Sequence, residues 1–159
     1  RMHHGVSNPT LTLDFGAACG EPAPPAAGSG WRCFEDRPGK LGWIADGAAP
    51  SGTLTFEASS SELTAESRLT AAFLRSYEGM GRARLWLDDD YHHGLTLNGS
   101  WGAPTSQTDL AIMGVASLCG PSCLARRHQQ ARHRIRVRRL PADAGGHPNK
   151  FKLLLLELC

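Results

Sequence analysis

The densest group of potential ligands and acid–base residues is the run Asp-Asp-Asp-Tyr-His-His at residues 88–93. Carboxylates suit calcium or magnesium, and paired imidazoles suit zinc or copper. The candidate metal ligands are therefore Asp89, Asp90, His92 and His93. Side chains of adjacent residues point to opposite faces of a strand, so these four converge only if the backbone loops. We expect a solvated hairpin tip with turn-forming aspartates instead, and neither a metal site nor a cofactor.

A second concentration of chemistry is the basic stretch at residues 126–139, which holds seven arginines and no acid. On a strand, alternate residues share one face at a spacing of about 6.6 Å, and the residues so placed are Arg132, Arg134, Arg136 and Arg138. Such a ladder suits a polyanion, either an acidic glycan or an acidic partner. A charged face that keeps the protein soluble, or an edge protected against pairing, is the alternative interpretation.

Nucleic acid is a poorer match for this basic stretch. Residues 126–139 contain no aromatic side chain on which bases could stack. The rest of the chain holds 10 bases (17 − 7) against 15 acids, so it is net acidic. We therefore expect a glycan or protein partner rather than nucleic acid.

Tryptophan in a β-rich chain points to sugar binding, because an exposed indole stacks on the apolar face of a pyranose. Trp101 lies in Gly-Ser-Trp-Gly-Ala-Pro, among loop-forming residues, and is the best candidate for such a platform. Gln107 and Asp109 follow it closely and are the candidate partners for sugar hydroxyls. A core position is the alternative for Trp101, and it is the interpretation we favour for Trp43 and Trp86.

The five cysteines are an odd number, which leaves one thiol free or joined to another chain. Cys119 and Cys123 flank Gly-Pro-Ser, a turn-forming insert that brings two sulfurs within bridging reach. We expect a second bridge from Cys33 to Cys159, on the assumption that the first and last strands lie side by side. Cys19 to Cys33 is the rival pairing.

Asn98 begins Asn-Gly-Ser, an acceptor sequence for N-glycosylation. Together with the disulfide-like cysteine spacing, it favours a secreted protein of the cell surface or cell wall. The alternative is an intracellular protein with reduced, buried cysteines. No apolar run approaches the roughly 20 residues of a membrane span, so we expect no membrane insertion.

The elements that would position these residues are short strands. The chain has 159 residues, of which 41% are hydrophobic, enough for one domain with a core. Its 18 glycines and 10 prolines favour short elements joined by turns. Alternating or continuous apolar patterns predict strands at 53–58, 68–77, 82–87, 94–97, 109–117, 132–139 and 150–158. Only residues 61–68 suggest a short helix.

These strands predict an all-β fold, an antiparallel β-sandwich of jelly-roll (galactose-binding-like) type. An enzyme built from βαβ units is disfavoured, because the pattern lacks the crossover helices that parallel strands need. Residues 17–30 are rich in Pro, Ala and Gly and predict a linker. We therefore expect a flexible N-terminal arm and linker at 1–30, contributing little to the core, and a sandwich domain at 31–159.

Several segments are specific enough to point to a family. They are WRCFEDRPGKLGWIA from Trp31, FLRSYEGMG from Phe73, Ser100-Trp101, Thr105-Ser106-Gln107, and KFKL from Lys150. As a set, they resemble a β-rich region near the C-terminus of algal and plant proteins of the SGNH (GDSL-type) hydrolase kind. In those proteins this region follows the catalytic α/β domain. The resemblance covers residues 31–159 and implies a place beside a catalytic domain rather than an activity.

The chain departs from the hydrolase pattern at the nucleophile, because it contains no Gly-Asp-Ser. The spacing of Asp89 and His92, and of Asp90 and His93, matches that of the family's acid and base. Here, however, these residues lie in a polar loop, and the sequence offers no serine nucleophile for the histidine to activate. We therefore expect a non-catalytic accessory module that binds carbohydrate or a protein partner. The alternatives are a structural subunit of an extracellular assembly, or part of an SGNH-type esterase. A catalytic or structural chain of the same precursor is a further candidate partner.

Overall fold

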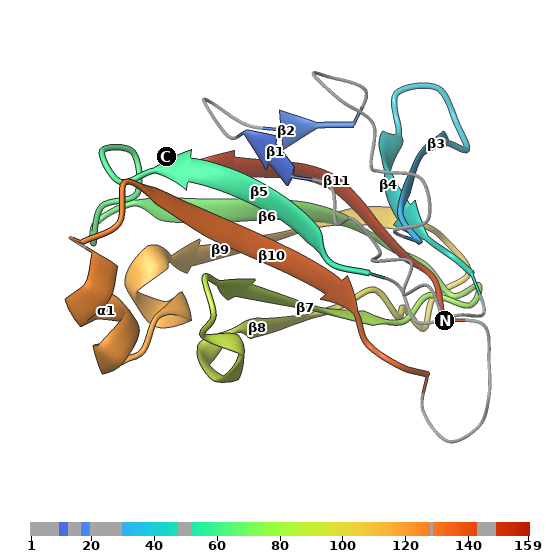
Figure 1. Cartoon of the computed structure of the whole chain (residues 1–159). Coiled ribbons are helices and arrows are strands. Elements are labelled where there is room, and N and C mark those ends of the chain that lie inside the picture. The colour runs from blue at the N-terminus through green and yellow to red at the C-terminus, as the bar shows by residue number, and fades with distance from the viewer. Residues whose placement is uncertain (1–9, 13–16, 20–29, 48–51, 128, 143–148) are drawn as a thin grey trace, which may run out of the picture.

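The strands of this protein form two sheets that pack face to face (Figure 1). The computed structural model describes residues 10–12, 17–19, 30–47, 52–127, 129–142 and 149–159. Sheet A consists, in spatial order, of β1 (Thr10–Thr12), β5 (Leu54–Ser59), β10 (Arg132–Arg139), β7 (Arg82–Leu87) and β8 (Leu95–Asn98). Sheet B consists of β3 (Arg32–Glu35), β4 (Leu41–Ala45), β11 (Phe151–Leu158), β6 (Arg68–Arg75) and β9 (Gln107–Gly114), and β2 (Ala17–Ala18) pairs with β11. The predicted all-β sandwich is confirmed.

Apolar side chains from both sheets fill the space between them, because each strand turns alternate residues inward. Trp43 of β4 is fully buried and meets Phe56 of β5 edge to face, with ring centroids 5.2 Å apart. Phe73 of β6 stacks on Phe151 of β11 at 5.8 Å. The core therefore lies between the sheets, and the remaining residues of each strand form two outer faces.

Helices are short in the described residues. They are η1 (Tyr91–His93), η2 (Val115–Leu118) and α1 (Pro121–Arg127), which lies at one end of the sandwich (Figure 1). None of them is long and apolar enough to cross a membrane. The short helix expected at 61–68 does not form, and Glu62 there accepts hydrogen bonds from the Ser59 amide and hydroxyl. These local bonds stabilise a turn in place of a helix.

Most of residues 1–30 lies outside the described residues, so the division into an arm and a domain stays a prediction. The described parts of this segment contact the sandwich. β1 pairs with β5 in parallel, and β2 pairs with β11 antiparallel. Cys19 is buried and belongs to the main hydrophobic cluster, so at this residue the segment does enter the core.

Two disulfides link the described residues. Cys119 bonds to Cys123 across the start of α1, as predicted. Cys33 bonds to Cys19, so the predicted bridge from Cys33 to Cys159 is wrong and the rival pairing is correct. Cys159 carries a free, exposed thiol.

The order of strands explains why Cys33 does not reach Cys159. β4 lies between β3 and β11, so the strand that carries Cys33 is not a neighbour of the last strand. Cys33 is in register with Trp43, and Trp43 is in register with Leu153. Cys159 lies six residues beyond Leu153, about 20 Å further along the strand.

The pairing of β4 with β11 brings the two backbones unusually close at Gly42. A Cβ atom at Gly42 would lie 2.5 Å from the main-chain oxygen of Leu153.

We expect Gly42→Ala to lower the free energy of unfolding by about 1–3 kcal/mol, because the strands must move apart. Gly47, at which a Cβ would meet no atom within 4 Å, provides the control. Its change to alanine should stay within about 0.5 kcal/mol of the parent in urea unfolding. Equal stabilities of the two variants would contradict this strand pairing.

Candidate ligand-binding sites

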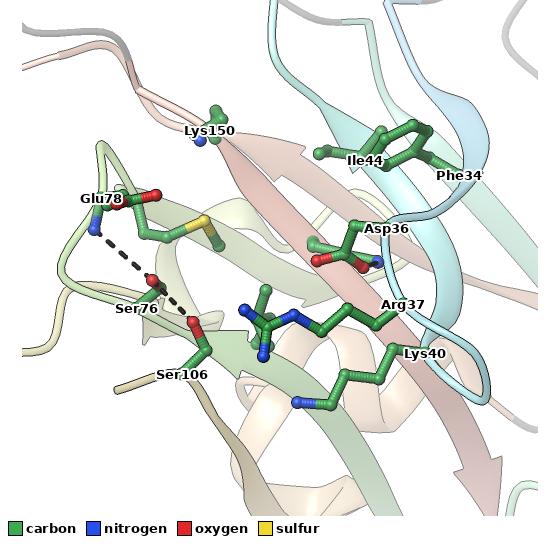
Figure 2. Close-up of a pocket in the computed structure, with 12 residues that line it drawn as sticks. Phe34, Asp36, Arg37, Lys40, Ile44, Ser76, Glu78, Ser106 and Lys150 are labelled. Atoms are coloured by element: carbon green, nitrogen blue, oxygen red, sulfur yellow. Dashed lines mark hydrogen bonds and ion pairs between the residues drawn. The ribbon is translucent and has the colours of Figure 1, made fainter. Parts of the chain in front are cut away.

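A small pocket opens on the outer face of sheet B, between the β3–β4 hairpin and the turn that follows β6 (Figure 2). Ile44, Leu74 and Lys152 reach this face because they alternate with core residues along β4, β6 and β11. Ile44 and Leu74, with Met80 and Phe34, give the pocket its apolar surface. Its volume is about 180 Å³, which is small beside the roughly 300–1,000 Å³ of pockets for drug-sized molecules. The space suits one small ring or head group.

Polar groups of both signs surround this apolar surface. Those labelled in Figure 2 are Asp36, Arg37, Lys40, Ser76, Glu78, Ser106 and Lys150. Arg37 extends from the hairpin towards Ser76 and Ser106 on the opposite side. The Ser106 hydroxyl donates to the Ser76 hydroxyl at 2.9 Å, and the Glu78 amide also donates to Ser76. The pocket therefore presents donors and acceptors to a ligand that has both, such as one rich in hydroxyl groups.

A buried ion pair holds the hairpin against sheet B at this pocket. Lys152 is 1% exposed, although it lies on the outer face, and its ammonium donates to the Asp36 carboxylate. The Lys152 ammonium also lies 5.6 Å from the centroid of the Phe34 ring. Burial acts to raise the pKa of Asp36, but the hydrogen bond and charge of Lys152, together with a main-chain hydrogen bond and the charge of Lys40, outweigh it, so this pKa lies below its ordinary value. The sequence did not predict this pair, although the segment KFKL from Lys150, singled out above, contains Lys152.

The predicted sugar-binding residues meet around an arginine. The Arg75 guanidinium lies over the Trp101 ring, 4.5 Å from its centroid, and donates to Asp109 at 3.0 Å. Gln107 is the β9 residue in register with Arg75. Trp101 is half-buried, and its indole N–H has no partner among the described residues. The structure thus brings Trp101, Gln107 and Asp109 together, but Arg75 covers one face of the indole. Their role in sugar binding stays a prediction.

The first two aspartates of the run at 88–93 bond to strand β10. Asp88 accepts the Arg134 amide and bonds to the ring of His133, each at 2.8 Å. Asp89 pairs with Arg136 at 3.0 Å. The described residues contain no group of three or more His, Cys, Asp or Glu that could hold a metal ion.

The third aspartate has a similar structural role. Asp90 bonds to His93 and accepts the Gly120 amide, both at 2.7 Å. The hydrogen bond with His93 is the main cause that holds the pKa of Asp90 below its ordinary value. A Cβ at Gly120 would lie 2.4 Å from the His93 ring, so this glycine packs directly on it. His92 is exposed, and no serine in the described part of the chain hydrogen-bonds to either histidine.

The predicted ladder of four arginines lies on the outer face of sheet A. Its members, Arg132, Arg134, Arg136 and Arg138, alternate along β10 with buried residues. Asn98, the last residue of β8 and the predicted glycosylation site, is exposed.

No family model matches this chain, and no curated protein sequence does. Two solved structures share its fold, both of a two-domain esterase (CEX) active on acetylated mannans, one co-crystallised with mannopentaose. Their TM-scores are 0.56 and 0.55 at 14% and 12% identity, over 82% of this chain. A Paenibacillus cycloisomaltooligosaccharide glucanotransferase matches 89% of this chain and 18% of its own, at 13% identity and a TM-score of 0.45. This chain spans about a third (32%) of the esterase's length, and the likeness shows a shared fold.

The Asp36–Lys152 pair gives a stability test. We expect Asp36→Asn to lower the free energy of unfolding by about 1–3 kcal/mol at pH 7, because a buried ammonium loses its counter-charge. Asp36 is 38% exposed, so the cost should stay below the roughly 3–5 kcal/mol of a fully buried pair. Combining Asp36→Asn with Lys152→Met should restore most of the loss, because no buried charge then remains.

Acid unfolding provides the control for that test. Because folding lowers the pKa of Asp36, its stabilisation is complete above the ordinary value of 3.8 and is lost as the pH falls through the lowered value. Asp36→Asn should lack this part of the pH dependence in urea unfolding measured from neutral to acidic pH. Parent and variant curves that differ by the same amount at every pH would contradict the ion pair.

Proposed function

We propose that this chain is a non-catalytic, carbohydrate-binding module of a secreted protein, and that the pocket beside the β3–β4 hairpin holds one sugar residue. The observation that carries the proposal is the composition of the pocket. Apolar and aromatic surface lies beside carboxylates, cations and hydroxyls, on a β-sandwich of the fold found in an esterase active on acetylated mannans.

The chemistry of the pocket matches the chemistry of a sugar ring. Phe34 is half-exposed, and the part of its ring that the Arg32 guanidinium, 4.5 Å from the centroid, leaves uncovered offers an aromatic surface for the apolar face of a pyranose. Glu78 accepts hydrogen bonds from sugar hydroxyls, and Arg37 and Lys40 donate to them. The Asp36–Lys152 pair holds these groups in place before a ligand arrives, which lowers the entropy lost on binding.

A non-catalytic role is supported because no serine in the described residues hydrogen-bonds to His92 or His93, and an Asp–His pair needs such a nucleophile to act as an esterase base. Both carboxylate oxygens of Asp90 are engaged, one by His93 and the other by the Gly120 amide. These bonds tie the β7–β8 loop to the segment before α1. The chain also spans about a third of the esterase that shares its fold. A catalytic domain on the same precursor is the partner that this arrangement suggests.

Secretion is supported by the two disulfides, which persist in oxidising compartments. Glycosylation of Asn98 stays part of this proposal, since the residue is exposed at the end of an edge strand.

A second candidate function is docking to a protein partner. Leu110 and Ile112 are both largely exposed on the outer face of β9, which is an edge strand of sheet B. Edge strands with apolar side chains readily pair or pack with another chain. A structural role in an extracellular assembly would use this surface.

Glycan binding is tested by calorimetric titration of the chain with acetylated and deacetylated manno-oligosaccharides. We expect Phe34→Ala and Arg37→Ala each to weaken binding at least about tenfold, about 1.4 kcal/mol, because each removes a direct contact. Arg68→Ala is the matched control, since Arg68 is exposed on β6 but does not line the pocket. No binding by the parent chain, or equal affinities of Arg37→Ala and Arg68→Ala, would contradict the pocket and favour the docking surface at Leu110 and Ile112.

The non-catalytic assignment is tested with a short-chain aryl ester and a serine-reactive phosphonate probe. We expect neither turnover nor labelling of the purified chain, because no serine in the described part of the chain hydrogen-bonds to His93 and could act as its nucleophile. His93→Ala is the control variant. Turnover that disappears in His93→Ala would overturn the assignment and restore the esterase alternative.

A further inference from the structure

The outer face of sheet A carries more arginines than β10 alone supplies. His133, Ile135 and Val137 are buried, so the residues between them on β10 point outward. Cross-strand register places two more arginines of β7 on the same face, since Arg84 is directly opposite Arg138. We call this surface the arginine face, and its members are Arg82, Arg84, Arg132, Arg134, Arg136 and Arg138.

Among the described residues, three carboxylates lie beside the arginines of this face. Glu57 of β5 is shared by Arg132 at 3.0 Å and Arg134 at 3.6 Å. Asp89 pairs with Arg136, and Asp88 is bonded to His133 and the Arg134 amide. Even without Arg82, five arginines face these three carboxylates in the described part of the chain, so cations outnumber acids on this face. The positive charge is therefore concentrated on this side of the molecule.

Three of the arginines are available to a ligand. The side chains of Arg132 and Arg134 are 67% and 57% exposed. The two arginines share a single carboxylate, that of Glu57. Arg138 is exposed and lies over the rings of Trp86 and Tyr91, at 5.6 and 5.1 Å from their centroids. Stacking of this kind orients a guanidinium without neutralising it.

Arg84 has a different role from these three. It donates to the main-chain oxygens of Tyr91 and His92, at 3.1 and 2.8 Å, and to the Thr96 hydroxyl at 3.0 Å. These bonds hold the loop between β7 and β8 over the sheet. This loop positions Tyr91 beneath Arg138, so Arg84 is a positioning residue for the arginine face.

We propose that the arginine face binds an acidic polysaccharide, a polymer with carboxylate or sulfate groups at regular intervals. Guanidinium groups spaced about 6.6 Å along a strand, and on strands about 4.8 Å apart, form two rows that match a repeated anion. The face is hollowed beside Arg132, Arg134 and Arg136, which line a depression with Glu57, Asp88, Asp89 and Gln130, and the more exposed Arg132 and Arg134 extend past these acids. A chain of sugars can lie along this surface and bury its charged groups against several arginines.

The same face is poorly suited to nucleic acid. Trp86 is buried, and Tyr91 packs edge to face on it with ring centroids 5.0 Å apart. Arg84 and Arg138 lie over the Tyr91 ring. These rings therefore offer no open surface on which a base could stack.

This inference is independent of the proposed sugar pocket, because the two sites lie on the outer faces of different sheets. The pocket is lined by residues of sheet B and its loops, whereas the arginine face belongs to sheet A. Binding of neutral manno-oligosaccharides should be unchanged when the arginine face is altered. A result that contradicts binding at the arginine face can therefore be distinguished from one that contradicts sugar binding in the pocket.

The test is affinity of the full chain for polygalacturonate, a carboxylated polymer, and for heparin, a sulfated one, measured by titration at several salt concentrations. We expect Arg134→Gln to weaken binding about threefold to tenfold and to reduce its salt dependence, because one ionic contact is lost. Arg134→Gln with Arg138→Gln should weaken it further. Arg68→Gln is the matched control, since it removes the same charge from an exposed strand residue outside the face, and it should change binding less than twofold.

Several results would overturn the proposal. They are failure of the parent chain to bind either polymer at low salt, equal losses of affinity in Arg134→Gln and Arg68→Gln, and tighter binding to single-stranded DNA of similar charge.

Preference for polygalacturonate would assign the face to uronates, and preference for heparin would assign it to sulfated glycans. Thermal unfolding of Arg134→Gln at the parent temperature would show that the loss of binding is not a loss of folding.

Discussion

Strand β10 contributes residues both to the core of this sandwich and to its charged surface. It lies between β5 and β7, so its register with both neighbours determines which residues face the core. His133 is fully buried and bonded to Asp88, the residue after β7, which has a positive φ of 50°. Asp tolerates this left-handed conformation better than most residues. A slip of one residue would bury arginines and expose the core, so packing and surface charge depend on the same register.

The two outer faces that result have different chemistry. On sheet A, arginines alternate along β10 and β7, with Glu57, Asp88 and Asp89 beside them. On sheet B, the buried ammonium of Lys152 finds its counter-charge on a hairpin, and the hairpin forms one wall of a pocket. The Cys19–Cys33 disulfide anchors that hairpin to the segment that includes β2. The protein therefore presents two faces of different chemistry on opposite sides of one sandwich, and our two proposals place a ligand on each.

Local patterns predicted much of this fold, and long-range pairings account for what the sequence did not reveal. Alternation identified β7 and β10 because each needs only neighbouring residues to define its inward face. The bridge from Cys33 was assigned wrongly because it depends on strand order, which no local pattern contains. The pocket was missed because Lys152 stands in a strand of apolar residues, just before four leucines, and its partner Asp36 is 116 residues away. Trp101 and Asp109 were grouped by their proximity in the sequence, and in the structure both contact Arg75, which comes from another strand.

The central claim is that the pocket on sheet B is a sugar-binding site of a non-catalytic module. The most direct measurement is a titration of the ¹⁵N-labelled chain with acetylated manno-oligosaccharide, followed by the amide resonances in NMR spectra. The account predicts saturable shifts concentrated at the β3–β4 hairpin and at Ser76, Glu78 and Ser106, with the amides of β10 unchanged. Spectra that do not change, or shifts confined to the surroundings of Trp101 or to the arginine face, would contradict it.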